Sequence, residues 1–515
     1  MHEQATLDRM CAKALARDPA REAIEFAGAW VCWGQLRELA ERVGALLGQS
    51  GCHAQASVAF VAHNRPSAAG ALLGMLAQAR TVQMVYGFQS AKGIARDLER
   101  LEPAVVVAAG EVLSPEVLDV LRARGAAAIA LSELHAAPVP GFELSRSDAS
   151  CGRMPPEIQI LTSGTTGPPK RFGMTHDMVA RHVVSANKNY RASDSDLASE
   201  PPLFSYYPLG NISGIYGVLP PLLRGHRVVL VERFSVQEWL RYLRRYRPER
   251  ASLPPAGFQM VLDADVPREE LAGLRGIASG AAPLDLEVHR AFEARYEIPI
   301  LLSYGATEFA GPVTSMTLEL HARWGKTKLG SAGRPIAGAR LRVVDPETGE
   351  LLLPGQEGIL EVIAPRIGPE WIRTSDLAVV DADEFLFLRG RADGAILRGG
   401  FKLLPETIER ALLLHPAVSE VAVVGLSDTR LGQVPAAVVQ LKRDAVEPTI
   451  DELERHLRDH VYATHIPAAW RVVEALPRTA SFKVDRRAAR DLFEPELRQP
   501  TTEARNGRSS SEVRP

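Results

Sequence analysis

The chain has 515 residues, 46% of them hydrophobic and 24% charged, and its 60 Lys and Arg against 62 Asp and Glu give a net charge of -2. This length exceeds what a single hydrophobic core accommodates, so we expect at least two domains. The balanced charge offers no basic excess for a nucleic acid or an anionic membrane, which argues against a nucleic-acid-binding protein.

The cysteine and hydrophobic patterns favour a cytoplasmic protein without a transmembrane segment. The four cysteines form no CxxC pair, so neither a disulfide framework nor a zinc site is indicated. The apolar stretch 68–79 is broken by Gly70 and Gly74 and is too short to cross a bilayer, which predicts a buried helix. Residues 1–10 lack the apolar run of a signal peptide.

The N-terminal part of the chain alternates helical and strand patterns. Apolar residues recur at helical spacing over 36–47, and short apolar strands are expected at 57–62 and 104–108. Helices alternating with apolar strands predict parallel sheets that are covered on both faces. From residue 339 the period becomes two, and 341–343 and 351–353 flank the turn sequence 345–349. This change predicts a β-rich subdomain over about 330–390.

After residue 390 the pattern is that of a compact mixed segment. Helices are expected at 405–414 and 450–461, and strands at 418–424 and 436–441. The expected fold class is therefore α/β and α+β multidomain, with a large N-terminal domain of helix-covered sheets and a small mobile α+β C-terminal domain. The expected boundaries are 1–390 for the first domain, 391–497 for the second, and 498–515 for a disordered tail poor in apolar residues.

A loop rich in small and hydroxyl residues follows the short apolar strand 158–161. Its small residues let several backbone N–H groups converge, and its hydroxyls and terminal lysine add donors and charge, which is how a loop binds a polyphosphate. It is not a Walker A loop, because its lysine does not follow a glycine and no Ser or Thr comes next. The predicted phosphate-binding residues are Thr162, Ser163, Gly164, Thr165, Thr166, Gly167 and Lys170.

This loop resembles the (S/T)-S-G-(S/T)-T-G-x-P-K-G signature of the superfamily that contains AMP-forming acyl-CoA synthetases, nonribosomal-peptide adenylation domains and firefly-type luciferases. The match departs at Arg171, where the family prefers Gly. Further motifs occur in the family's order. Residues 280–284 resemble its adenine-side segment, which implies that Gly280, Ala281 and Ala282 lie beside adenine.

Residues 303–308 resemble the YGxTE motif of the same family. By this resemblance Tyr304 stacks on adenine, Thr307 donates to the α-phosphate, and Glu308 holds Mg²⁺ between phosphates. Residues 374–376 resemble the family's TGD motif, whose aspartate, here Asp376, binds both ribose hydroxyls.

Residues 390–393 resemble the GRxD motif, which implies that Arg391 contacts the ribose or the α-phosphate and that Asp393 is the hinge between the domains. In the IKxxG segment that follows, the usual lysine is replaced by Leu397, and Arg398 is a candidate for a neighbouring cation.

By the same resemblance, Gly399 and Gly400 line the tunnel for the pantetheine arm of coenzyme A. Residues 477–486 resemble the C-terminal PxTxSGKxxR motif, with Lys483 at the position of the catalytic lysine and Phe482 in place of the usual Gly.

The resemblance implies an acid–thiol ligase that uses ATP to convert a small carboxylic acid into acyl-AMP, releases pyrophosphate, and transfers the acyl group to coenzyme A. Lys483, Thr307 and Glu308 are the expected catalytic residues, and ATP, Mg²⁺ and coenzyme A the expected cofactors. The stretch 206–214 resembles the family's PLFHxxG segment. The expected substrate-binding residues are Tyr207, Asn211 and Gly305.

Two alternatives remain open at this point. Instead of an acyl-CoA synthetase, the protein could be an acyl-AMP ligase that loads a separate carrier protein, or a degenerate nucleotide-binding protein without catalysis. The second alternative is motivated by Leu397 and Phe482, which replace residues that the family uses.

Overall fold

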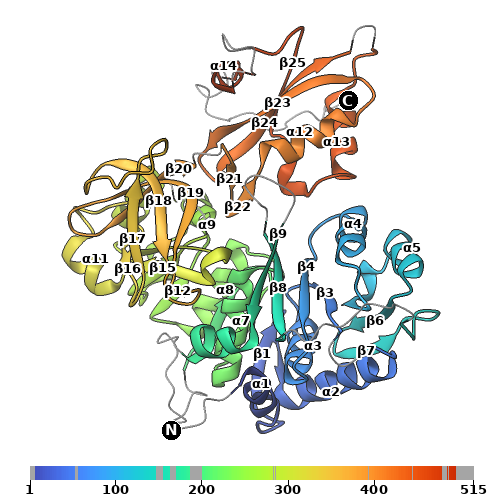
Figure 1. Ribbon diagram of the computed structural model, residues 1–515. Coiled ribbons are helices and arrows are strands. Elements are labelled where there is room, and N and C mark those ends of the chain that lie inside the picture. Colours follow the sequence, from blue (N-terminus) through green and yellow to red (C-terminus); the bar gives the residue numbers. More distant parts are fainter. Residues whose placement is uncertain are drawn as a thin grey trace, which may run out of the picture.

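A computed structural model of the chain describes residues 6–52, 56–145, 155–162, 170–185, 200–281, 284, 286–391, 394–442, 445–477, 484 and 486–493. A large body contains the elements up to β20, and a smaller one, from β21 onwards, lies against it at one end (Figure 1). The expected fold class is confirmed. No helix in the described ranges is both long and apolar enough to cross a membrane.

A seven-stranded sheet forms one half of the large body, in the order β7-β6-β5-β3-β4-β8-β9. Its central strands are parallel, and β7 and β9 are antiparallel edges. Alternate residues of β3 enter two different cores: Phe60 packs on the side of α1, α2, α3 and α7, whereas Val61 packs on the side of α4 and α5. Both faces are therefore covered, which is why its strands are apolar throughout.

The elements of this half match the expected pattern. The buried helix predicted at 68–79 is α3, which is buried along nearly its whole length. The strands are β3 (Val58–Ala62), β4 (Val82–Tyr86), β5 (Val105–Ala109), β6 (Ala127–Ser132), β7 (His135–Pro138), β8 (Glu157–Thr162) and β9 (Lys170–Thr175). The helices are α1 (Leu7–Leu15), α2 (Trp33–Gln49), α3 (Pro66–Ala77), α4 (Ala91–Leu101), α5 (Pro115–Arg124), α6 (His176–Met178), which continues as a π-helix over Val179–Ser185, and α7 (Ile212–Arg224).

Two further sheets form the other half, in the orders β10-β11-β1-β2 and β12-β13-β14-β15-β16. Residues of α8, α9 and α10 build their shared core with β10 to β14. The strands are β1 (Glu22–Phe26), β2 (Ala29–Cys32), β10 (Leu203–Ser205), β11 (Val228–Leu230), β12 (Arg250–Ser252), β13 (Gly276–Ser279), β14 (Ile300–Ala306), β15 (Gly311–Ser315) and β16 (Arg334–Pro335). The helices are α8 (Val236–Tyr246), α9 (Pro255–Asp263), α10 (Leu286–Tyr296) and α11 (Leu318–Trp324).

The predicted β-rich region is an antiparallel sheet of β17 (Arg340–Val344), β18 (Glu357–Ile363), β19 (Trp371–Val380) and β20 (Leu386–Arg391). The segment 351–353 folds back on β17 around the predicted turn: Leu351 bridges Val344, and the Leu352 N–H donates to the carbonyl of Val343 at 2.9 Å. The pairing is short, and the side chains of Leu351 and Leu353 are 69% and 72% exposed.

The small body is a five-stranded sheet with helices on both faces, as the pattern after residue 390 predicts. Its strands are β21 (Ile396–Arg398), β22 (Phe401–Leu403), β23 (Val418–Asp428), β24 (Gly432–Leu441) and β25 (Ala469–Val473). Its helices are α12 (Pro405–Leu413), α13 (Ile450–Arg458) and α14 (Arg486–Asp491). Residues of α12 and α13 pack into one core and those of α14 into another.

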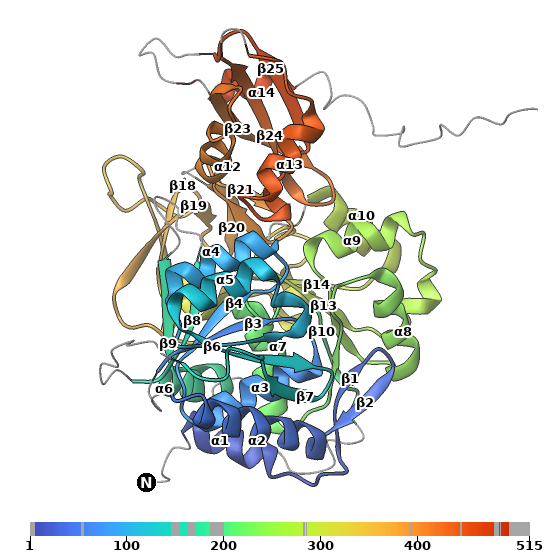
Figure 2. The same cartoon turned by 90° about the vertical axis from the view of Figure 1, so that its right-hand side faces the viewer.

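The two bodies meet along α4, as the perpendicular view in Figure 2 also shows. Lys92 forms an ion pair with Asp459 at 2.7 Å, and the Tyr462 hydroxyl donates to Asp97 Oδ2 at 3.1 Å. The ring of Tyr86 makes edge-on contacts with those of Phe401 and Tyr462, at centroid distances of 5.8 and 5.9 Å. These contacts fix one arrangement of the small body over the end of the seven-stranded sheet.

Candidate active site

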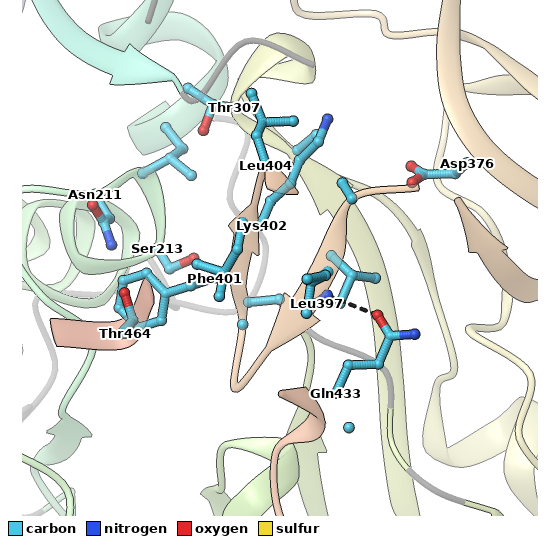
Figure 3. A pocket seen from close by; sticks show the side chains of 18 of the residues that line it. Asn211, Ser213, Thr307, Asp376, Leu397, Phe401, Lys402, Leu404, Gln433 and Thr464 are labelled. Carbon is cyan, nitrogen blue, oxygen red and sulfur yellow. Dashed lines mark hydrogen bonds between the residues drawn. The ribbon is translucent and has the colours of Figure 1, made fainter. Parts of the chain in front are cut away.

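A cavity of about 670 Å³ lies between the two bodies. Residues from β4, β8, α7, β14 and β19 line it on one side, and residues from the β21–β22 hairpin, β24 and the segment before β25 line it on the other. Figure 3 shows side chains from both bodies directed into this space. The predicted site residues that line it are Asn211, Ala281, Tyr304, Gly305, Thr307, Glu308, Asp376 and Gly400.

Two predicted nucleotide residues are joined directly. Tyr304 lies near the end of β14, and its hydroxyl donates to Asp376 Oδ2 in β19 at 2.5 Å. Asp376 lies within a ten-residue strand, where its backbone N–H donates to Thr374 Oγ1 at 3.0 Å. The strand fixes the direction of the carboxylate, and the phenol holds it in place.

Beyond Tyr304 the chain turns into a short 3₁₀ helix, Thr307–Phe309. This turn leaves Thr307 half-buried and Glu308 exposed at the cavity wall. A hydroxyl donor and a carboxylate therefore face the same space as Asp376.

Small residues lie in and beside the part of the wall next to Tyr304: Gly305 and Ala281 line the cavity, whereas Gly280 lies just outside its wall. A Cβ added to Gly305 would lie 2.5 Å from the carbonyl oxygen of Gly311, so no larger residue fits there. A Cβ on Gly280 would lie 2.7 Å from Ser303 Oγ. Ala281 has a φ of 68°, which is uncommon for a residue with a side chain and marks a tight change of direction at the wall.

The loop before α7 is held by Asn64, a residue that the sequence patterns did not single out. Asn64 is completely buried; its amide donates to the carbonyls of Tyr206 and Tyr207, and its oxygen accepts from the N–H of Leu209 at 2.8 Å. This anchor positions the segment that leads to Asn211, the N-cap residue of α7. The Tyr207 hydroxyl lies 3.5 Å from the carbonyl oxygen of Gly280, beside the cavity but not in its wall, and burial raises the pKa of this phenol.

Gly399 and Gly400 form the two-residue turn of the β21–β22 hairpin, with φ values of 53° and 89°. Two consecutive positive φ values are typical of a type I′ turn and favour glycine. Gly400 lines the cavity, whereas Gly399 donates its N–H to the carbonyl of Leu431 at 2.8 Å.

The two faces of this hairpin have different surroundings. Ile396 and its partner Leu403 are buried in the core of the small body. Leu397 and its partner Lys402 line the cavity.

Arg398 is directed away from this face. Its guanidinium donates to the carbonyls of Thr464 and Ile466, and burial lowers its pKa. The expectation that Arg398 supplies a cation beside Leu397 is therefore wrong in this arrangement, because strand alternation places it on the other face.

With this geometry in place, the comparisons with known proteins decide the family. The family described as AMP-binding enzyme matches residues 11–369, and its C-terminal domain matches residues 407–483. The chain belongs to the AMP-binding enzyme family. This membership accounts for the order of the motifs and for the pairing of a large and a small domain around one cavity.

Relatives within the family include CoA ligases. The chain is 31% identical over 376 residues to 4-coumarate-CoA ligase 1 of Narcissus pseudonarcissus, covering 68% of this chain and 66% of that protein. It is 32% identical over 347 residues to sulfoacetate–CoA ligase of Cupriavidus necator, covering 64% and 66%. The matches thus span slightly less than two thirds of these relatives.

Solved structures show the same fold over nearly the whole chain. An amide bond synthetase from Marinactinospora thermotolerans superposes with a TM-score of 0.79 at 24% identity, covering 95% of this chain and 100% of that one. An o-succinylbenzoate CoA synthetase from Bacillus subtilis gives a TM-score of 0.77 at 22% identity, covering 95% and 98%.

Several residues predicted for this AMP-binding site lie outside the described residues, namely Ser163, Gly164, Thr165, Thr166, Gly167, Ala282, Asp393 and Lys483. Thr162, Lys170 and Arg391 are described by their backbone alone. Thr162 pairs with Lys170 across the antiparallel strands β8 and β9, so the two ends of the predicted phosphate loop lie side by side. The strand β9 was not expected; it ends at Thr175, whose hydroxyl caps α6.

The cavity wall of this AMP-binding enzyme also contains residues that the motifs missed, including Tyr86, Ser213, Lys402, Tyr462 and Thr464. Lys402, Tyr462 and Thr464 belong to the small domain, so they share one wall with Tyr86 and Ser213 only when the small domain contacts the large one. Of these residues, the sequence could have indicated Lys402 as the cross-strand partner of Leu397, but only if the register of the hairpin had been known.

Proposed function

We propose that the protein activates a carboxylic acid with ATP, forming acyl-AMP and pyrophosphate, and then transfers the acyl group to the thiol of coenzyme A. The observation that carries this proposal is the single cavity lined by Tyr304, Thr307, Glu308 and Asp376 from the large domain and by the glycine hairpin from the small one. The named CoA ligases among its relatives support the same reaction.

In the first step a carboxylate attacks the α-phosphate, and both groups are anionic. Charge neutralisation and alignment therefore dominate this step. Thr307 donates a hydrogen bond to the α-phosphate, Asp376 accepts from the ribose hydroxyls, and the loop 162–170 binds the departing pyrophosphate. Lys483 offsets the charge that develops during the attack.

Glu308 fits the role of a magnesium ligand, because it is an exposed carboxylate in the cavity wall. The described residues contain no group of three or more His, Cys, Asp or Glu side chains that could hold a metal by themselves. Mg²⁺ held by Glu308 would take its other ligands from phosphates and water, and it would neutralise charge between the phosphates.

The acid is proposed to occupy the part of the cavity near Asn211 and Gly305. Met84, Ile160 and Ile212 line the same cavity and are apolar. Asn211 is neutral, so it can orient a substrate by hydrogen bonding but cannot neutralise a second carboxylate. This wall favours an acid whose body carries no further charge.

Pyrophosphate release is the direct test of the first step. A panel of 4-coumarate, other aryl acids, alicyclic acids, fatty acids and sulfoacetate is incubated with ATP and Mg²⁺, and we expect release with at least one acid that carries no charge besides its carboxylate.

Glu308→Gln should lower the rate of pyrophosphate release on the order of a hundredfold. Lys483→Ala should abolish acyl-AMP formation but leave transfer from supplied acyl-AMP intact. Equal loss of both steps would contradict the assignment of Lys483.

The acceptor is tested by supplying coenzyme A, a phosphopantetheinylated carrier protein or a simple amine to the enzyme loaded with acyl-AMP. Thioester formation on coenzyme A supports the proposal. Transfer only to the carrier or only to the amine would replace the proposed acceptor, and absence of pyrophosphate release with every acid would favour a non-catalytic nucleotide-binding protein.

The described cysteines, Cys11, Cys32 and Cys52, are free thiols. Free thiols persist in a reducing compartment, which supports the proposal that the reaction takes place in the cytoplasm.

A further inference from the structure

The β21–β22 hairpin has a cation on its cavity face, one strand away from where the family has its lysine. Leu397 occupies the family's lysine position in β21, and the residue directly opposite it in β22 is Lys402. Residues directly opposite each other on antiparallel strands point to the same face, with Cβ atoms about 4.5–5.5 Å apart. A side chain as long as lysine covers that separation easily.

The surroundings of the hairpin confirm which face this is. The neighbouring pair, Ile396 and Leu403, is 1% and 0% exposed in the core of the small domain. Leu397 and Lys402 must therefore point the opposite way. Residues of both faces border the cavity, but Leu397 and Lys402 do so without being part of that core. The N–H of Leu397 donates to Gln433 Oε1 at 3.0 Å, which ties the hairpin to β24 and fixes this orientation.

The Lys402 side chain points towards residues that are predicted to bind the nucleotide. In Figure 3 it extends from β22 into the cavity, towards the part lined by Thr307 and Asp376. Arg389 also lines the cavity, but its guanidinium pairs with the exposed carboxylate of Glu357 at 4.0 Å.

We propose that Lys402 supplies the cation that position 397 lacks, and that its ammonium contacts the phosphate of the acyl-adenylate during transfer to the thiol. This inference rests on the proposed function. The thiol sulfur bonds to the acyl carbon, and the bond from that carbon to the phosphate oxygen breaks with its electron pair leaving on AMP. The thiol proton is released to solvent.

The leaving AMP gains a second negative charge in this step. A fixed ammonium beside the phosphate stabilises that charge as it develops, and removing one such electrostatic group typically costs on the order of a hundredfold in rate. Both lysines follow the expected hinge, but Lys402 lines the cavity in the arrangement of the domains described above, whereas Lys483 is assigned to the adenylation step. The proposal therefore gives the two lysines different half-reactions.

The test compares Lys402→Leu with the exchange variant Leu397→Lys/Lys402→Leu, which returns the lysine to the family's position. For Lys402→Leu we expect acyl transfer from purified acyl-AMP to coenzyme A to fall about a hundredfold, with pyrophosphate release within threefold of wild type. The exchange variant should transfer the acyl group at least tenfold faster than Lys402→Leu. Lys442→Leu, an exposed lysine of the same domain, serves as the control and should leave both rates unchanged.

Binding provides a readout that does not require turnover. Lys402→Leu should weaken the affinity for AMP about tenfold, measured by calorimetry, while the affinity for adenosine stays the same because only AMP has the phosphate. A chain that binds AMP in this lysine-dependent way but releases no pyrophosphate with any acid would refute the proposed function and not the contact.

Three results would overturn the role of Lys402. They are wild-type transfer by Lys402→Leu, an equal fall in both half-reactions, and an exchange variant as slow as Lys402→Leu.

Discussion

The phenol of Tyr304 and the carboxylate of Asp376 are joined by a hydrogen bond of 2.5 Å across two different sheets. Tyr304 lies near the end of the strand β14, which belongs to the core of the large domain, and Asp376 lies in the β-rich sheet. The bond therefore couples the two layers at the point where both face the cavity, and it holds the carboxylate in place.

Removing the phenol oxygen should weaken nucleotide binding. Tyr304→Phe leaves the Asp376 carboxylate with one donor fewer, and we expect a loss of about 1–2 kcal/mol, or about five- to thirtyfold in the Kd for AMP. Calorimetric titration with AMP measures this. Tyr296→Phe is the matched control, because its buried hydroxyl donates to the carbonyl of Val266. Unchanged affinity in Tyr304→Phe would show that the bond does not position the carboxylate.

The ion pair between Lys92 and Asp459 should favour acyl transfer, because it joins the domains in the arrangement that places the hairpin at the cavity. Both side chains are about half exposed, so the pair is worth less than about 1 kcal/mol, which limits the effect to about fivefold. Lys92→Glu should slow thioester formation by two- to fivefold at low salt and spare pyrophosphate release.

The reciprocal exchange Lys92→Asp/Asp459→Lys should restore the rate, and high salt should erase the difference. Lys326→Glu, a charge reversal at an exposed site outside the domain contact, controls for net charge. A fall that persists at high salt would speak against a screened ion pair as the cause.

His465 should make the small domain sensitive to acid. Burial, together with the charges of Arg398 and Arg96, lowers the pKa of His465 from 6.5 to about 4, so the folded protein keeps the ring neutral. The unfolded chain binds a proton below pH 6.5. The contribution of His465 to the free energy of unfolding is thus fully present above pH 6.5. It declines as the pH falls towards 4, by at most about 1.4 kcal/mol per pH unit.

His465→Gln should remove this contribution, and its melting temperature relative to wild type should rise as the pH falls from 7 to 4.5. His135→Gln, at an exposed position, provides the reference. A difference between His465→Gln and wild type that stays constant with pH would exclude His465 as the titrating group.

Gly400 should be needed for transfer and not only for folding. Its φ of 89° is the same as that of Gly355, which lies in an exposed turn of the β-rich sheet. Alanine at either position is strained by roughly 1–2 kcal/mol, so both variants should lose similar stability in calorimetry.

Only Gly400→Ala should slow acyl transfer, by about tenfold, since its hairpin lines the cavity and carries Lys402. Equal transfer rates in the two variants would indicate that the hairpin turn matters for stability alone.

The sequence by itself determined the sheets, the change to a β-rich region, the small α+β domain and the order of the family motifs. These depend on local periodicity and turn chemistry, and so does the placement of Thr307 and Glu308 directly after the strand that ends near Tyr304. The same local information did not show how short the pairing of 351–353 with β17 is, because a two-residue period does not show whether a partner surface exists to bury the segment.

Only the tertiary structure decided which residues share the cavity. The partner of Leu397 depends on hairpin register, and a shift by one residue would have turned Lys402 to the core face. The bond between Tyr304 and Asp376, the anchor made by Asn64, and the contact of α4 with the small domain join residues far apart in the chain. Such contacts arise from how sheets and domains pack, and no local pattern encodes them.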